Sequence, residues 1–128
     1  MRLPKDDIPV KIDIPGAVVR HLPDFGTAAT GPLAAEYFSL GAGTDIAPLL
    51  KGLQDDACQS VHWGFMIDGD LVVTYTDGST DRCTTGDLFH WPAGHSVRVE
   101  RDAEVILFSP QYAHAEVMDH MIATMASA

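Results

Sequence analysis

The side chains best suited to chemistry gather in residues 56–97, which hold both cysteines and three of the six histidines. Cys58 and His62 are four residues apart, so on a strand both would lie on the same face. His90 and His95 stand on either side of a Pro-Ala-Gly turn. Thiol and imidazole groups are competent metal ligands. Each also has a structural interpretation, Cys58 as a small buried hydrophobe and His62 as a hydrogen-bonded core histidine.

The sequence lacks the motifs of several common enzyme and nucleotide-binding classes. It contains no G-x-S-x-G segment, no H-E-x-x-H pair and no glycine-rich loop leading into a helix. A serine hydrolase, a zinc protease of that type and a nucleotide-binding protein are therefore disfavoured.

Short strands at near-even spacing must position the candidate residues. Residues 59–67 alternate as expected for a strand, with Val61, Trp63, Phe65 and Ile67 on one parity and Ser60, His62, Gly64 and Met66 on the other. The Asp-Gly pairs at 68–69 and 77–78 predict hairpin turns, and two further strands are predicted at 95–100 and 104–108. Residues 44–53 are predicted to form an irregular edge segment. With no helical pattern between the strands, an all-β barrel or sandwich is predicted.

A helix is predicted only at the C-terminal end. Ser109 and Pro110 resemble an N-cap followed by a proline in the first helical turn. Beyond them, apolar residues follow the i, i+3, i+4, i+7 spacing of an amphipathic helix: Met118, Met121, Ile122 and Met125.

Two motifs resemble those of the cupin superfamily. The segment 86–94, GDLFHWPAG, has a glycine, five residues and then Pro-x-Gly, as in the second cupin motif. His62, with six residues between it and Gly69, stands where the first motif has an acidic ligand. The combination of WG-x-x-x-x-G with GD-x-x-x-x-P-x-G-H is similar to small bacterial single-domain cupins (RmlC-like), most of which lack an assigned activity. The resemblance covers residues 33–110.

The resemblance implies a fold and a domain plan. The fold would be all-β, a cupin-type double-stranded β-helix (jelly-roll barrel) with a short C-terminal α-helix. One domain, residues 1–128, would comprise an N-terminal arm and edge strands (1–32), the barrel core (33–110) and the helix (111–126). A length of 128 residues suits a single core.

The resemblance also implies a metal site, which in metal-binding cupins uses three histidines and a glutamate. The glutamate position falls on His62, and the two histidine positions of the first motif fall on Cys58 and Asp56. Asp56 is more readily explained as part of a turn. The second-motif histidine position falls on Val97, which has no ligand atom.

His95, two residues earlier on the same parity as the valine, could replace the missing ligand, and His90 is a further candidate. The predicted metal ligands are thus Cys58, His62, His90 and His95. Sulfur and nitrogen donors favour zinc, with iron, nickel or manganese as alternatives.

Aromatic and apolar side chains of the same stretch are predicted to line a pocket, although the sequence leaves open which of them face inward. They are Trp63, Phe65, Met66, Tyr75, Phe89 and Trp91. The histidines outside the motifs are expected to be solvated or to pack: His21, His114 and His120.

Several functions fit this pattern. The first hypothesis is a cupin that binds a divalent metal and a small organic ligand, with oxygenase, isomerase or lyase chemistry, because the fold does not choose among reactions. The alternative is a metal-free small-molecule binding or sensory barrel without turnover. A third is a structural dimeric module. Whether the chain is an enzyme stays open.

Composition limits the partners. The net charge of −10, with 8 basic and 18 acidic residues, argues against nucleic acid, which requires clustered Lys and Arg. No apolar run suits a membrane span or a signal peptide, so a cytoplasmic protein with two reduced thiols is expected. Prolines among alternating apolar residues in 1–16 suggest an extended arm, which in many cupins crosses to a second subunit, so a homodimer is predicted.

Overall fold

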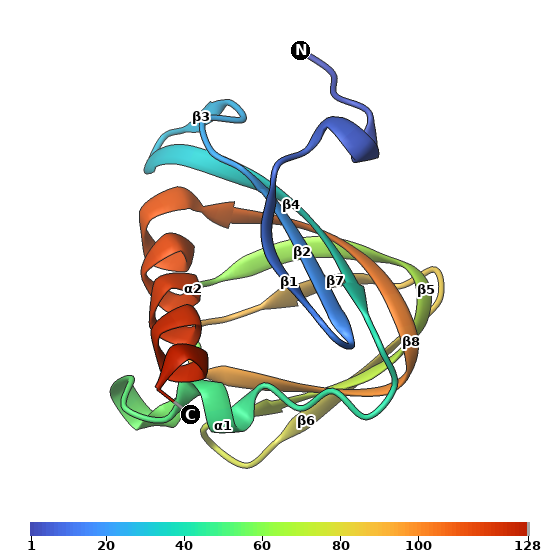
Figure 1. Cartoon of the computed structure of the whole chain (residues 1–128), viewed down its shortest axis with the longest axis vertical. Helices are drawn as coiled ribbons and strands as arrows, with labels where there is room; N and C mark the ends of the chain where they lie inside the picture. Colours follow the sequence, from blue (N-terminus) through green and yellow to red (C-terminus); the bar gives the residue numbers. More distant parts are fainter. Residues whose placement is uncertain (128) are drawn as a thin grey trace.

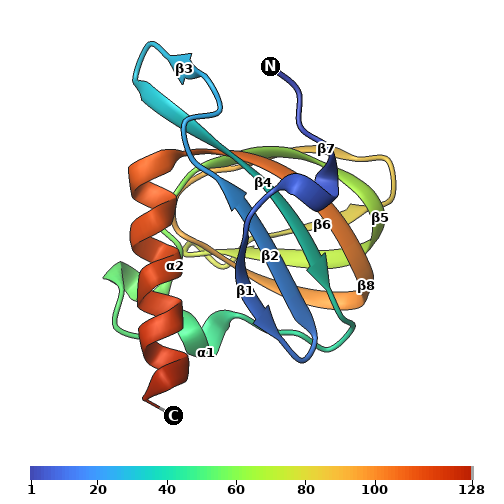
Figure 2. The ribbon, with the colours of Figure 1, turned by 45° about the horizontal axis from the view of Figure 1, so that its top comes forward.

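Antiparallel strands curl into a barrel, and one helix lies across an end of it (Figures 1 and 2). The structure is a computed structural model that describes residues 1–127, so Ala128 of the predicted domain lies outside the described residues. The hydrogen-bonded strand order is β1-β2-β4-β8-β5-β6, with β3 paired to β4 and β7 paired to β5. The predicted all-β jelly-roll barrel with a C-terminal helix is confirmed.

The elements follow in this order: η1 (Lys5–Asp7), β1 (Val10–Ile14), β2 (Ala17–Leu22), β3 (Thr27–Ala28), β4 (Gly31–Leu40), α1 (Ala47–Leu50), η2 (Gln54–Asp56), β5 (His62–Tyr75), β6 (Thr80–Thr84), β7 (Leu88–Trp91), β8 (His95–Pro110) and α2 (Gln111–Ala126). The short helix α1 replaces part of the irregular segment predicted at 44–53. Its Leu50 is fully buried, which explains why this segment folds back against the barrel end.

Two long strands, β5 and β8, form the frame of the barrel. They pair with each other from Trp63 and Phe108 at one end to Tyr75 and His95 at the other. The predicted hairpin at 68–69 is wrong, because β5 continues through this pair with shifts in register. The predicted division of β8 into two strands is also wrong.

Glycine is required at position 69 for a different reason than a turn. Gly69 has φ 120°, and a Cβ there would lie 2.5 Å from the Cα of Ala103 on β8. The positive φ that Asp-Gly favours here produces an irregularity that bends a continuous strand. At 77–78 the predicted hairpin is confirmed, with Gly78 at φ 87° and its N–H donating to the Tyr75 carbonyl at 2.9 Å.

Alternation along β5 and β8 separates the core from the surface. The residues pointing into the barrel are fully or almost fully buried, among them Met66, Leu71, Val73, Val99, Val105 and Leu107. The inward parity of β5 changes at the irregularity around Gly69. Before it, the odd-numbered Trp63, Phe65 and Ile67 point outward, and Trp63 is 47% exposed. The conspicuous aromatic run of β5 therefore belongs to the outside of the barrel.

Helix α2 closes the end of the barrel where β5 begins (Figure 1). Its Met118 packs with Ile12 of β1 and Val19 of β2, and its Val117 packs with Leu50 of α1 and with Cys58. Strand β1 pairs with β2 of the same chain. Among residues 1–127, no helix is both long and apolar enough to cross a membrane.

Candidate metal centre

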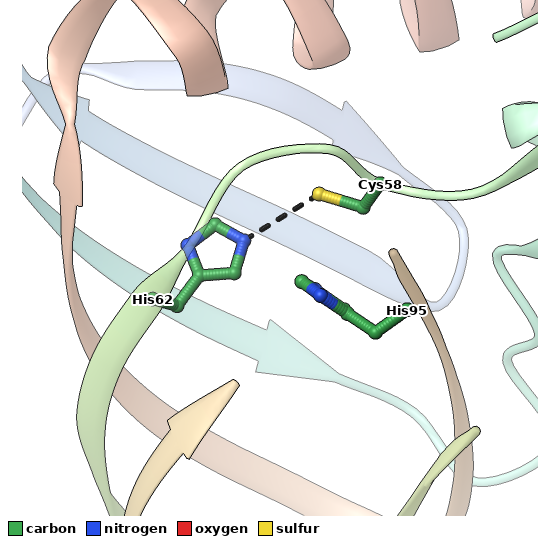
Figure 3. Close-up of side chains that lie close together, drawn as sticks. All are labelled: Cys58, His62 and His95. Carbon is green, nitrogen blue, oxygen red and sulfur yellow. Dashed lines mark hydrogen bonds between the residues drawn. The ribbon is translucent and has the colours of Figure 1, made fainter. Parts of the chain in front are cut away.

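Cys58, His62 and His95 meet at the end of the barrel beneath α2 (Figure 3). One donor atom of each, a sulfur and two ring nitrogens, lies within 4.8 Å of the other two. All three side chains are buried, with at most 2% of their surface exposed. Cys58 Sγ is 3.6 Å from His62 Nε2.

Backbone hydrogen bonds bring Cys58 to the site. The Cys58 N–H donates to the His95 carbonyl at 2.8 Å, and the Gly94 N–H donates to the Cys58 carbonyl at 2.7 Å. Cys58 lies in an extended segment before β5, so the expectation that it shares a strand with His62 is wrong. The two side chains still meet, because the bridge to β8 directs Cys58 inward.

His95 presents Nε2 as its free ring nitrogen. Its Nδ1 lies 2.8 Å from the Pro92 carbonyl oxygen, which can only accept a hydrogen bond. Nδ1 therefore carries the proton, and Nε2 keeps its lone pair. A backbone acceptor of this kind is a common support for a histidine that binds metal.

Burial makes the three groups neutral in the absence of a cation. It lowers the pKa of His95 to about 4 and the pKa of His62 well below its usual value, with the neighbouring His114 and His95 adding to the effect on His62. Burial also raises the pKa of the Cys58 thiol to about 12. An ion binding here would need to displace the thiol proton, as metal ions do at cysteine sites.

A second polar cluster lies directly behind His62. Glu36 on β4 accepts a hydrogen bond from Ser109 Oγ through Oε1 and contacts His114 Nδ1 of α2 through Oε2. Ser109 Oγ is also 2.6 Å from His62 Nδ1. Glu36, His62 and His114 form a second group whose donor atoms lie within 4.8 Å of one another.

This second cluster was not identified from the sequence. The sequence predicts His114 to be solvated or to pack, and no motif includes Glu36. The one signal in the sequence is that Glu36 is the only charged residue in 31–40, an otherwise apolar and small stretch. A charge inside such a strand requires a partner when it is buried.

An apolar cavity of about 100 Å³ opens between the site and α2. Cys58, His62, His95 and His114 line one part of it. The rest of its wall is apolar except for Thr44 and comes from α2, β1, β2, β4, β7, β8 and the segment around α1. It includes Ile12, Val19, Phe38, Ile46, Leu107, Met118, Met121 and Met125.

Of the six side chains predicted to line a pocket, Trp91 lines this cavity. Trp63 and Phe65 point outward and are partly exposed, and Met66 is buried in the core. Phe89 stacks on Trp91, with ring centroids 3.9 Å apart. The last of the six, Tyr75, donates its hydroxyl proton to Asp81 at 2.8 Å.

Three other positions named from the motifs do not contribute a donor atom to the cluster of Cys58, His62 and His95. His90 is exposed on the outer face and stacks on Trp63, with ring centroids 5.4 Å apart, so the structure does not bring it to Cys58. Asp56 is exposed and accepts a hydrogen bond from the Gly52 N–H at 2.9 Å, as a turn residue. Val97 lines the cavity.

The fold resembles solved structures, although no protein-family model and no curated protein matches the sequence. Oxalate decarboxylase from Lactobacillus farciminis, in a formate complex, is 23% identical over 83% of this chain and 31% of its own, with a TM-score of 0.58. Ectoine synthase from P. lautus is 16% identical over 82% of this chain and 71% of its own, with a TM-score of 0.57. A conserved Streptococcus pyogenes protein of unknown function is 21% identical over 74% of each chain, with a TM-score of 0.54.

These likenesses establish the fold: the chain is a cupin-fold protein, as its two motifs indicate. The RmlC-like subtype is compatible with them and stays a prediction. The chain spans less than a third of the length of the oxalate decarboxylases that it resembles.

Proposed function

We propose that this protein binds one divalent metal ion through Cys58, His62 and His95, and a small organic ligand in the adjoining cavity. The observation that supports this proposal is the convergence of three buried donor atoms within 4.8 Å of one another beside an otherwise apolar cavity. Three protein ligands are typical of sites that keep a coordination position open for water or substrate. An ion held there would act as a Lewis acid on a ligand oxygen.

The donor set favours zinc. A thiolate with two imidazoles suits borderline and soft ions better than hard ones. We therefore expect this donor set to prefer zinc most and manganese least, with iron and nickel intermediate in preference. Oxalate decarboxylase from Bacillus subtilis, another structure that this fold resembles, has Mn(II) centres. The cysteine in this chain argues for a different ion.

The cavity favours a ligand that is small and mostly apolar, with one coordinating group. No Lys or Arg is among the described residues that line the cavity, so a dianion such as oxalate would lack a counter-charge beyond the metal. The volume of about 100 Å³ is below the roughly 150 Å³ of an engineered cavity that binds benzene. Oxygenase, isomerase and lyase reactions remain compatible with such a site.

Metal analysis of protein purified without a histidine tag tests the proposal. Reconstituted wild type should hold one ion per chain, and Cys58→Ser and His62→Ala should each lose most of it. Cys83→Ser and His90→Ala are matched controls, because Cys83 is buried in a separate part of the core and His90 is on the outer face. If Cys58→Ser and His62→Ala retain the wild-type stoichiometry, the ligand assignment is wrong.

A metal-free binding or sensory protein is the second candidate. It is favoured by the largely apolar wall of the cavity, which could take up a small apolar molecule without an ion. Wild type that takes up no zinc, iron, nickel or manganese after reconstitution, but gains thermal stability from a small apolar compound, would support this candidate.

A further inference from the structure

Side chains from three separate elements form a buried chain of polar contacts that ends on His62. Glu36 comes from β4, Ser109 from β8 and His114 from α2. Their exposed fractions are 2%, 0% and 4%, so water does not compete for these contacts. Their connection to a proposed metal ligand suggests a role beyond packing.

The direction of each hydrogen bond follows from the chemistry of the groups. A carboxylate can only accept, so the hydroxyl proton of Ser109 goes to Glu36 Oε1. Ser109 Oγ then accepts a proton from its other neighbour, His62 Nδ1, at 2.6 Å. The second carboxylate oxygen, Oε2, accepts from His114 Nδ1, which fixes the orientation of the carboxylate.

We infer that Glu36 and Ser109 are positioning residues that hold His62 as the Nδ1–H tautomer, so that its Nε2 lone pair faces Cys58 and His95. This inference rests on the proposed function for its purpose. The opposite tautomer would direct an N–H toward Cys58 Sγ, 3.6 Å away, and a protonated ring nitrogen cannot coordinate an ion. His95 receives the same support from the Pro92 carbonyl.

The same cluster has a rival interpretation as a second metal site, because donor atoms of Glu36, His62 and His114 lie within 4.8 Å of one another. Both carboxylate oxygens and His62 Nδ1 already have hydrogen-bond partners. A cluster that satisfies its own donors and acceptors is better suited to orienting a ligand than to binding a second ion.

The tautomer can be read directly in the metal-free protein. Proton–nitrogen correlation spectra of the imidazole rings, assigned to His62 with a His62→Gln variant, should show the proton on Nδ1 in wild type. Ser109→Ala removes the acceptor and should give a mixture of tautomers. A wild-type His62 with its proton on Nε2 would overturn the inference, whether or not the protein binds metal.

Zinc affinity, measured by competition with a chelator, tests the purpose of the contact. Ser109→Ala and Glu36→Gln should bind zinc about 10- to 100-fold more weakly than wild type, with the stoichiometry unchanged at one. Ser39→Ala is the matched control, because Ser39 Oγ donates to Glu104 Oε2 at 2.7 Å between the same two strands without touching His62.

Each outcome decides between the interpretations. Affinities of Ser109→Ala and Ser39→Ala within twofold of each other would refute a positioning role. Two ions in wild type, falling to one in Glu36→Gln, would show a second metal site instead. If wild type binds no metal, the proposed function fails, and the tautomer in the metal-free protein still decides this inference. Should Ser109→Ala not fold, Glu36→Gln and the wild-type spectrum carry the test.

Discussion

Two buried imidazoles of the candidate site contribute to the response of the metal-free protein to acid. His95 has its pKa lowered to about 4 and His62 has its pKa lowered well below the usual value, both mainly by burial. In the unfolded chain both histidines titrate near pH 6.5. Between about pH 6.5 and pH 4 the unfolded state therefore binds more protons than the folded state, so stability falls as the pH falls through this range.

We predict that one such histidine costs on the order of 2–3 kcal/mol of unfolding free energy between pH 7 and pH 4. Urea unfolding of metal-free protein at several pH values measures this loss. His95→Gln should flatten the dependence, whereas His90→Gln, at an exposed position, should leave it unchanged. Equal pH dependence in wild type and His95→Gln would contradict the prediction.

Val97 offers a place for a fourth ligand. It lies on β8 with the same parity as His95 and lines the cavity beside Cys58 and His62. We predict that Val97→His adds a nitrogen ligand and strengthens zinc binding. The larger side chain should cost about 1–3 kcal/mol of stability in the metal-free form. Cobalt-substituted protein, whose absorption depends on the ligand set, measures the first effect, and an unchanged spectrum would contradict it.

At the level of residues, part of the site was predictable. Cys58 and His62 are close in sequence, and the motif glycines and proline identify the turn that precedes His95. Glu36 and His114 could not be found in this way, because they are 78 residues apart and meet only through the packing of α2 on the barrel. Periodicity assigns a residue to a face, but it does not say which faces meet.

Among the secondary-structure elements, the bend in β5 depends on one glycine. Gly69 has φ 120° and lies where any Cβ would collide with the backbone of Ala103. We predict that Gly69→Ala lowers the unfolding free energy by about 2–4 kcal/mol, from backbone strain together with steric overlap. Gly78→Ala is the control, because Gly78 has φ 87° with nothing within 4 Å of its Cβ position, and only strain of about 1 kcal/mol applies.

Denaturant unfolding of both variants measures the difference, and equal losses would show that the close approach to β8 has no energetic consequence.

The same glycine explains a failure of prediction from sequence. An Asp-Gly pair indicates positive φ, and both a hairpin and a bend in a continuous strand satisfy it. Only the pairing of β5 with β8 along its whole length decides between them. The helix α2, by contrast, was predictable from the spacing of its methionines. The predicted N-cap at Ser109 is wrong, because Ser109 belongs to β8 and donates its hydroxyl proton to Glu36, and the helix begins at Gln111.

For the molecule as a whole, we predict the oligomeric state. The homodimer predicted from the proline-rich arm stays a prediction. Strand β1, at the end of that arm, pairs with β2 of its own chain. Sedimentation equilibrium should give twice the chain mass of 13.8 kDa if the prediction holds. Removal of residues 1–9 should then shift the protein toward the monomer. A wild-type mass of 13.8 kDa would refute the dimer.

The Cys58 thiol lies beneath α2, where Val117 and Leu50 pack against it. Its pKa of about 12 leaves almost no thiolate at neutral pH, and alkylating reagents attack the thiolate. Iodoacetamide would therefore modify this sulfur only in molecules whose helix has transiently detached from the barrel. The rate at which the adduct accumulates would therefore report how often α2 detaches and exposes the interior of the barrel.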